Sequence, residues 1–145
     1  MTIPTKEQVR ATIKEWAPMM KIADWRIDFE FANRLEMESI GKKEGCCGFC
    51  RRQRLVKQAV INIDPKHPDV IEDWEQVLAH EMFHIVTDDF FYHANCCLDF
   101  VPEPAYDTFD NQMNMYYERL VDDLAKGFVF ALRRCSSCQD PPTAS

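Results

Sequence analysis

The chain has 145 residues, of which 46% are hydrophobic and 28% are charged, and its formal net charge is −7. This length fits one domain with a substantial core, and the composition is too apolar for a disordered chain. No apolar stretch approaches the roughly 18 residues that a membrane span needs, and an acidic chain is a poor general binder of nucleic acid. The N-terminus has no basic end followed by an apolar block, so we expect no secretion signal and a cytoplasmic protein.

The pattern of apolar residues predicts six elements. In chain order they are a helix at 5–16, strands at 25–31, 49–55 and 57–64, and helices at 69–88 and 106–134. The helices repeat apolar side chains every three or four residues, and the first strand alternates apolar and charged side chains. Thr5 and Gln8 have the spacing of a capping box at the first helix.

The connecting segments hold glycine or proline. Residues 34–48 and 89–105 are expected to be loops, and residues 139–145 a flexible tail. Residues 1–138 are expected to form a single domain of the α+β class. Its parts are an N-terminal helix, a small, three-stranded and mostly antiparallel sheet, and two long helices that pack on each other.

The helix expected at 69–88 contains His80-Glu81-Met82-Phe83-His84, an H-E-x-x-H motif. On a helix, residues four apart lie about 40° apart around the axis and about 6 Å along it, so both imidazoles can reach one ion. Glu81 lies at the flank of that face, where a carboxylate can take a proton from a water that a metal activates. In a chain of this composition the motif would arise by chance about once in a hundred.

A catalytic zinc site usually has three protein ligands, so a third ligand is required. Glu118 and Asp122 share one face of the helix expected at 106–134, and this face becomes apolar farther along, at Val121 and Ala125. Glu118 could complete a His/His/Glu ligand set, and Asp122 could accept the free N–H of a ligand histidine. A solvated acidic face would show the same two residues, so their assignment depends on the first motif.

The two motifs, His80-Glu81-x-x-His84 and Glu118-x-x-x-Asp122, resemble those of the gluzincin metallopeptidases. The likeness is greatest to compact members, the minigluzincins and the phage and bacterial peptidases of the ImmA/IrrE kind. It covers most of the chain, about Trp25 to Leu132, and includes the order of elements, because a small sheet precedes the H-E-x-x-H helix in that family.

This resemblance implies a minimal zincin-like domain that hydrolyses peptide bonds in a peptide or protein substrate. It implies that His80, His84 and Glu118 bind one catalytic Zn²⁺, that Glu81 is the general base, and that Asp122 supports a ligand histidine. It also implies that the strand at 59–63 is the sheet edge that pairs with the substrate backbone.

Peptidases of this kind often use a Tyr or His to stabilise the oxyanion of the reaction. The candidates are Tyr92, His93 and Tyr106, in or beside the loop expected between the two long helices. An ordinary, partly buried aromatic residue is the alternative for each of them. Tyr117 directly precedes Glu118 and is expected to project off the face that carries it.

Other interpretations stay open. Glu44-Gly45-Cys46 is similar to a segment of peptide deformylases, so a deformylase-like amide hydrolase with Cys46 as the third ligand is one alternative. Asp88, on the histidine face two turns farther on, is another third ligand. A non-catalytic, zinc-containing protein-binding module is a third alternative, although a structural zinc site does not need Glu81.

The chain has seven cysteines, so at least one has no partner within the chain. Cys47 with Cys50 and Cys135 with Cys138 have C-x-x-C spacing, and together they could hold a second, structural zinc. Small buried residues and exposed thiols are the alternative. The segment 42–57 is rich in Lys and Arg and could hold an acidic protein or a nucleic acid, but a solvated outer face of a hairpin is the preferred interpretation.

Overall fold

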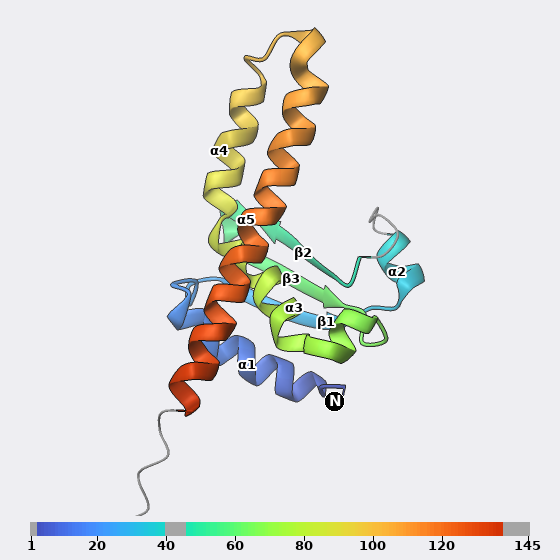
Figure 1. The fold of residues 1–145 in the computed structure, drawn as a ribbon, viewed down its shortest axis with the longest axis vertical. Helices are drawn as coiled ribbons and strands as arrows, with labels where there is room; N and C mark the ends of the chain where they lie inside the picture. The colour runs from blue at the N-terminus through green and yellow to red at the C-terminus, as the bar shows by residue number, and fades with distance from the viewer. Residues whose placement is uncertain (1–2, 40–45, 138–145) are drawn as a thin grey trace, which may run out of the picture.

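The computed structural model describes residues 3–39 and 46–137 of the chain. In chain order its elements are α1 (Lys6–Met19), β1 (Arg26–Phe31), α2 (Arg34–Ser39), β2 (Gly48–Gln53), the short 3-10 helix η1 (Arg54–Val56), β3 (Gln58–Ile63), α3 (Pro68–Val86), α4 (Asp88–Leu98) and α5 (Glu103–Ser137). The fold is α+β, as the sequence predicts, and α3 packs on the long α5 (Figure 1). None of these described helices is long and apolar enough to cross a membrane.

The three strands form one mixed sheet in the order β1-β3-β2. β3 pairs in parallel with β1 and antiparallel with β2, so the sheet is not mostly antiparallel. The connection from β1 to β2 contains α2 and leaves room for β3 between the two strands. The alternation of apolar and polar residues within each strand does not encode this strand order. The expectation that residues 59–63 form a sheet edge is therefore wrong, because β3 is central and β2 is an edge.

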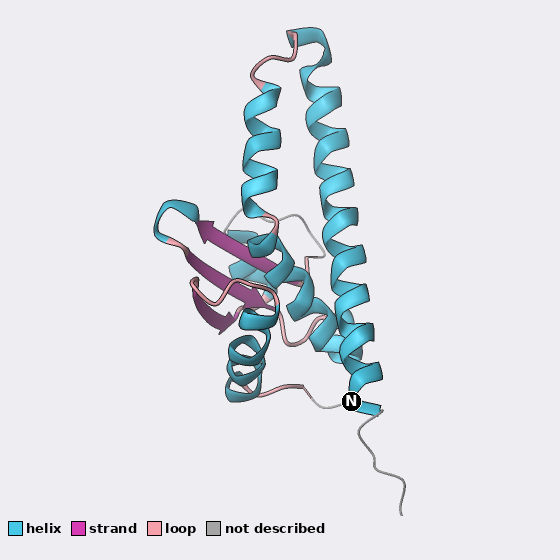
Figure 2. Cartoon of the chain, turned by 90° about the vertical axis from the view of Figure 1, so that its left-hand side faces the viewer, coloured by secondary structure: helices cyan, strands magenta, loops and turns pink. Residues whose placement is uncertain are grey.

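One face of the sheet is buried. Phe29, Ile61 and Cys50 lie side by side on this face and are almost fully buried, whereas Arg26 and Arg51 on the other face are exposed. α1 and α3 pack against the buried face, and α5 crosses over α3. Figure 2 shows the sheet, α3 and α5 as successive layers.

Local hydrogen bonds define where the helices begin. The predicted capping box is confirmed, since the Gln8 N–H donates to Thr5 Oγ1 at 3.1 Å and the Thr5 N–H donates to Gln8 Oε1 at 2.8 Å. Inside α3, Asp73 has non-helical φ and ψ of −152° and 80°, and its Oδ1 accepts the N–H of Gln76 at 3.2 Å. The kink therefore gives the part of α3 that carries the H-E-x-x-H motif its own N-cap.

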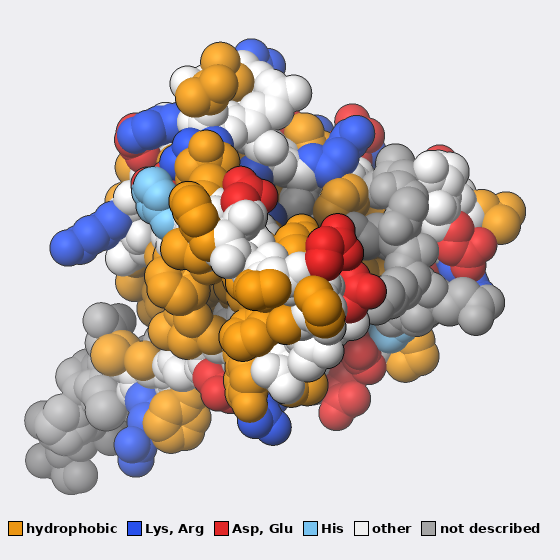
Figure 3. All heavy atoms as spheres, turned by 90° about the horizontal axis from the view of Figure 1, so that it is seen from above, with side chains coloured by type: hydrophobic (Ala, Val, Ile, Leu, Met, Phe, Trp, Pro, Cys, Tyr) orange, Lys and Arg blue, Asp and Glu red, His pale blue; other side chains and the backbone are white. Residues whose placement is uncertain are grey.

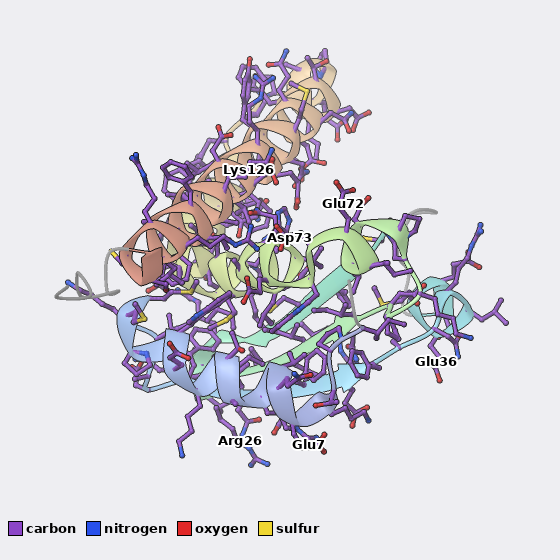
Figure 4. The ribbon with its side chains drawn as sticks, turned by 60° about the horizontal axis from the view of Figure 1, so that its bottom comes forward. Glu7, Arg26, Glu36, Glu72, Asp73 and Lys126 are labelled. Carbon is purple, nitrogen blue, oxygen red and sulfur yellow. The ribbon has the colours of Figure 1, made fainter. Side chains whose placement is uncertain are left out.

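The kink is held from outside by α5. Arg133 donates to the two carboxylate oxygens of Asp73 at 2.9 and 2.8 Å and to Glu75 at 2.9 Å. Figure 4 shows Asp73 where α3 meets α5. The bidentate geometry ties the C-terminal end of α5 to the start of the motif-bearing part of α3.

Two expected loops contain helices. Residues 34–39 form the short α2, and most of the segment 89–105 belongs to α4 and to the start of α5. Pro102 and Pro104 lie in the turn and the first turn of α5, where proline is tolerated, so they do not interrupt a helix. α4 and the N-terminal part of α5 stand side by side and project away from the sheet (Figures 1 and 2).

Substitution of glycine by alanine should change the free energy of unfolding in opposite directions at Gly48 and at Gly127. A Cβ on Gly48 would lie 2.5 Å from Oε1 and 2.9 Å from Cγ of the buried Glu81, whereas a Cβ on Gly127 would meet nothing within 4 Å. We expect Gly127→Ala to raise the free energy of unfolding by about 0.5–1 kcal/mol, because glycine weakens a helix interior. Gly48→Ala should lower it by about 1–3 kcal/mol through overpacking. Urea unfolding followed by circular dichroism measures both, and equal midpoints would contradict the close approach of β2 to Glu81.

Candidate metal centre

Three potential ligand atoms converge between α3 and α5. Nε2 of His80 lies 3.4 Å from Oε2 of Glu118, and Nε2 of His84 lies 3.7 Å from the same oxygen. An ion with tetrahedral bonds of about 2.0–2.1 Å would hold its ligand atoms about 3.3 Å apart. The observed separations are close to this value, so the His80, His84 and Glu118 group is able to bind a metal ion.

The packing of the two helices produces this convergence. Met82 on α3 and Val121 on α5 are both fully buried, which brings the motif face of α3 against α5. The side chain of His84 is 12% exposed and that of His80 is 24% exposed, whereas that of Glu118 is 58% exposed. The group is therefore buried at its histidine side and open to solvent at its carboxylate side.

Asp122 lies on the opposite side of the His80 ring from Glu118. Its Oδ1 is 3.9 Å from Nδ1 of His80, which is within range for electrostatic attraction. Burial alone would lower the pKa of His80, but the hydrogen bond to Glu118 and the charges of Glu81, Glu118 and Asp122 outweigh it and raise that pKa.

The raised pKa of His80 makes the stability of the metal-free protein depend on pH. In the metal-free protein the protonated His80 stabilises the fold at pH values below its unfolded-state pKa. This contribution is lost as the pH rises through the raised pKa of the folded state. An incoming metal ion must displace the same proton, so metal affinity falls when the solution is made acidic.

A chain of hydrogen bonds fixes the tautomer of His84. Thr87 Oγ1 donates its only proton to the carbonyl of Phe83 at 2.7 Å, so it accepts from the Tyr117 hydroxyl, 2.9 Å away. The Tyr117 proton is then used, and Nδ1 of His84, 3.2 Å from the Tyr117 oxygen, must be the donor in that contact. The lone pair of His84 therefore lies on Nε2, the atom that faces Glu118.

Arg52 of β2 completes this chain. Its Nη1 donates to the His84 carbonyl at 2.7 Å and to the Tyr117 hydroxyl at 3.1 Å. Its Nε forms an ion pair with Asp88 at 3.2 Å, with both side chains mostly buried. Asp88, an alternative third ligand in the sequence, thus binds Arg52 and does not belong to the ligand group.

Glu81 lies in the same cleft as the ligand group. It is 4% exposed, beneath Gly48 at the start of β2. A cleft of about 460 Å³ is lined by Glu81 and by all three ligand residues, together with side chains of β2. A carboxylate is thus held beside the group that can bind a metal.

Cys46 also lines this cleft, and its Sγ donates to the carbonyl of Gly48 at 3.2 Å. It is not part of the group formed by His80, His84 and Glu118, so the geometry favours Glu118 over Cys46 as third ligand.

The structure does not bring the three oxyanion candidates to the cleft. The Arg54 guanidinium lies 3.6 Å above the ring of Tyr92, and His93 is the exposed next residue of α4. Tyr106 lies in the first turn of α5 and is 39% exposed. Neither these two tyrosines nor His93 is among the residues that line the cleft.

The predicted four-cysteine zinc site is not assembled within the described residues. Cys50 is buried in the core beneath the sheet, and Cys135 is exposed near the end of α5. Cys138 lies outside the described residues. Cys47 has a different set of neighbours, His67 and Asp69.

Three residues that orient His84 are not predicted from the sequence: Tyr117, Thr87 and Arg52. One signal was available for Tyr117, because it lies four residues before Val121 on the apolar stripe of the last helix and is 5% exposed. No pattern in the sequence links Arg52 to His84, which is 32 residues away, since the pairing depends on the position of β2 at the sheet edge.

Comparison of the chain with known protein families, with curated proteins and with solved structures gives no match. The resemblance to gluzincins therefore depends on the sequence motifs and on the order of the elements, and it stays a prediction.

Tyr117→Phe tests the orientation of His84. Removing the hydroxyl leaves Nδ1 without its acceptor, so we expect metal affinity to fall by about 10–100-fold while the fold is kept. Tyr116→Phe is the matched control, because Tyr116 is 60% exposed on the same helix. Isothermal titration of the metal-free proteins with Zn²⁺ measures both affinities. Equal affinities for the two variants would contradict the hydrogen-bond chain.

Proposed function

We propose that the protein is a zinc-dependent metallopeptidase that hydrolyses peptide bonds with Glu81 as general base. The observation that carries the proposal is the convergence of both histidine Nε2 atoms on one oxygen of Glu118, with the Glu81 carboxylate in the same cleft. A purely structural metal site would not need a buried carboxylate beside its ligands.

The donor set suits zinc, which accepts imidazole nitrogen and carboxylate oxygen and keeps a fourth position open in catalytic sites. A zinc ion bound there would polarise a carbonyl group and lower the pKa of a bound water to about 7. The exposed side of Glu118 leaves room for a substrate to approach. The role of Glu81 is to accept the proton of the water and to pass it to the leaving amine.

The strand proposed to bind the substrate backbone is β2, in place of the residues 59–63 expected from the sequence. β2 is at an edge of the sheet, and its residues line the cleft that holds the ligand group. An extended peptide added beside β2 would run past His80 and Glu81, since Gly48 lies directly over the Glu81 carboxylate.

Glu81→Gln tests the proposal. The amide keeps the shape of the side chain but cannot accept a proton, so we expect hydrolysis to fall by about 10²–10⁴-fold while one equivalent of zinc is retained at this site. Glu7→Gln on α1, remote from the cleft (Figure 4), is the control. Cleavage of a synthetic peptide library, read by mass spectrometry, measures the activity. Unchanged hydrolysis by Glu81→Gln would overturn the mechanism. Cys46→Ser tests the deformylase-like alternative, and we expect this variant to keep the zinc.

A second candidate function, a zinc-containing protein-binding module, is favoured by one observation. The hairpin formed by α4 and the N-terminal part of α5 exposes seven large apolar side chains, each 39–88% exposed: Phe90, Tyr92, Phe100, Tyr106, Phe109, Met115 and Tyr116. Figure 3 looks onto this end of the molecule and shows hydrophobic side chains gathered there. Exposed apolar surface of this extent is typical of interaction sites.

The charges of the hairpin indicate the chemistry of its partner. Between residues 90 and 117 the chain has four carboxylates, Asp99, Glu103, Asp107 and Asp110, and neither Lys nor Arg. A second copy of this surface would bring like charges together. The partner proposed is therefore a basic, amphipathic helical segment of another protein, which would match both the apolar side chains and the carboxylates.

A Lys/Leu amphipathic peptide with one Trp tests this binding by fluorescence. We expect the full-length protein to bind this peptide. The double substitution Phe100→Ser and Phe109→Ser should weaken binding at least tenfold. It should leave the fold intact, because both side chains are more than half exposed. Leu35→Ser on α2 is the control, since Leu35 is 76% exposed. Equal binding of a peptide with Glu in place of Lys, or dimerisation through the hairpin on gel filtration, would refute this partner. Glu81→Gln should leave the binding unchanged.

A further inference from the structure

A second group of ligand-type atoms lies where the start of β2 meets the start of α3. The ligand atoms of Cys47, His67 and Asp69 all lie within 4.8 Å of one another. Cys47 directly precedes β2, and its carbonyl accepts the N–H of Asp64 at 3.0 Å, just after β3. His67 and Asp69 lie at the N-cap and in the first turn of α3. Three segments of the chain thus meet at this group.

The separations within the group suit one ion. Nδ1 of His67 is 3.7 Å from Oδ2 of Asp69, close to the spacing of about 3.3 Å that one tetrahedral ion with bonds near 2 Å requires. Nδ1 accepts the N–H of Asp69 in a long hydrogen bond of 3.3 Å, so it carries a lone pair and no proton. An ion bound at Nδ1 would replace this long hydrogen bond. The His67 side chain is 20% exposed and that of Asp69 is 67% exposed, which leaves an approach for an ion from solvent.

The chemistry of the donors selects the ion. A thiolate, an imidazole and a carboxylate together favour Zn²⁺ and similar borderline metals over Mg²⁺ or Ca²⁺, which prefer oxygen. The positive end of the α3 dipole opposes a cation here. The charges of the thiolate and of Asp69 together neutralise a divalent ion, so the assembled site carries no excess charge.

A reactive role for the thiol is disfavoured. Burial raises the pKa of Cys47 to about 12, and the nearby charges of Glu81 and Asp69 act in the same direction. Without an ion Cys47 is therefore a protonated thiol and a poor nucleophile.

We propose that Cys47, His67 and Asp69 bind a second divalent metal ion of the zinc class, which fastens the edge strand β2 to the N-terminus of α3. On binding, the thiol proton passes to solvent and a metal–sulfur bond forms. Cys47 and Asp69 line the same acidic pocket as His80 and Glu81, so the ion would fix the edge strand beside the first metal centre. The proposal does not depend on hydrolytic activity.

Cobalt(II) titration of the full-length protein separates the two sites. Only a cysteine-ligated cobalt ion gives a sulfur-to-metal charge-transfer band in the near ultraviolet, and the His80, His84 and Glu118 group contains no sulfur. We expect two equivalents of cobalt and one such band. Cys47→Ser should lose the band and one equivalent, whereas Glu118→Ala should lose one equivalent and keep the band.

Cys97→Ser on α4 is the matched control, because this exposed thiol is outside the group, and it should keep both equivalents and the band. Asp69→Asn changes an exposed side chain and should weaken the cobalt affinity that is measured from the band at least tenfold. This variant replaces Cys47→Ser in the test if Cys47→Ser does not fold. A wild-type protein without the band would overturn the proposal. So would a band that survives Cys47→Ser, or one whose affinity is unchanged in Asp69→Asn.

Discussion

The packing of α3 on α5 is the constraint on which the candidate metal centre depends. His80 and His84 share a face of α3 by their spacing alone, but the third potential ligand, Glu118, comes from a different helix and lies 34 residues beyond His84 in the chain. Fully buried Val121 and Ala125 let α5 approach closely, and Arg133 holds the far end of the interface on the kink of α3. A small change in this interface would separate Glu118 from both imidazoles.

The edge strand β2 is coupled to the same centre at two points. At its start, Gly48 lies over the Glu81 carboxylate, and near its end Arg52 donates to the His84 carbonyl and to Tyr117. The strand therefore contacts the proposed base and also the hydrogen-bond chain that sets the tautomer of a ligand. A shift of β2 would therefore move both Glu81 and the hydrogen-bond chain of His84. The proposed metal ion at Cys47 would limit such a shift by holding the start of β2.

The parts of the structure that local periodicity encodes could be predicted from the sequence. The capping box of Thr5, the helix of the H-E-x-x-H motif and the helix of Glu118 all follow from spacings within one element. The parallel pairing of β1 with β3 could not be predicted, because it depends on β3 inserting between β1 and β2. The environment of Cys47 could not be predicted either, because its neighbours His67 and Asp69 approach it only in the folded chain. The sequence does not predict α4, because Pro102 and Pro104 indicate a loop, although residues 88–98 contain no helix breaker of their own.

The electrostatics of the candidate metal centre favour a cation, and the core of the protein does not depend on one. Burial lowers the pKa of His80, but the hydrogen bond to Glu118 and the charges of Glu81, Glu118 and Asp122 raise it, so the cluster favours positive charge at this ring. A divalent ion would supply more positive charge at the same place and would displace a proton bound to this ring. The apolar core, which includes Phe29, Ile61 and other buried side chains, is formed without any ligand atom. We therefore expect the fold to persist whether or not a metal ion occupies the cleft.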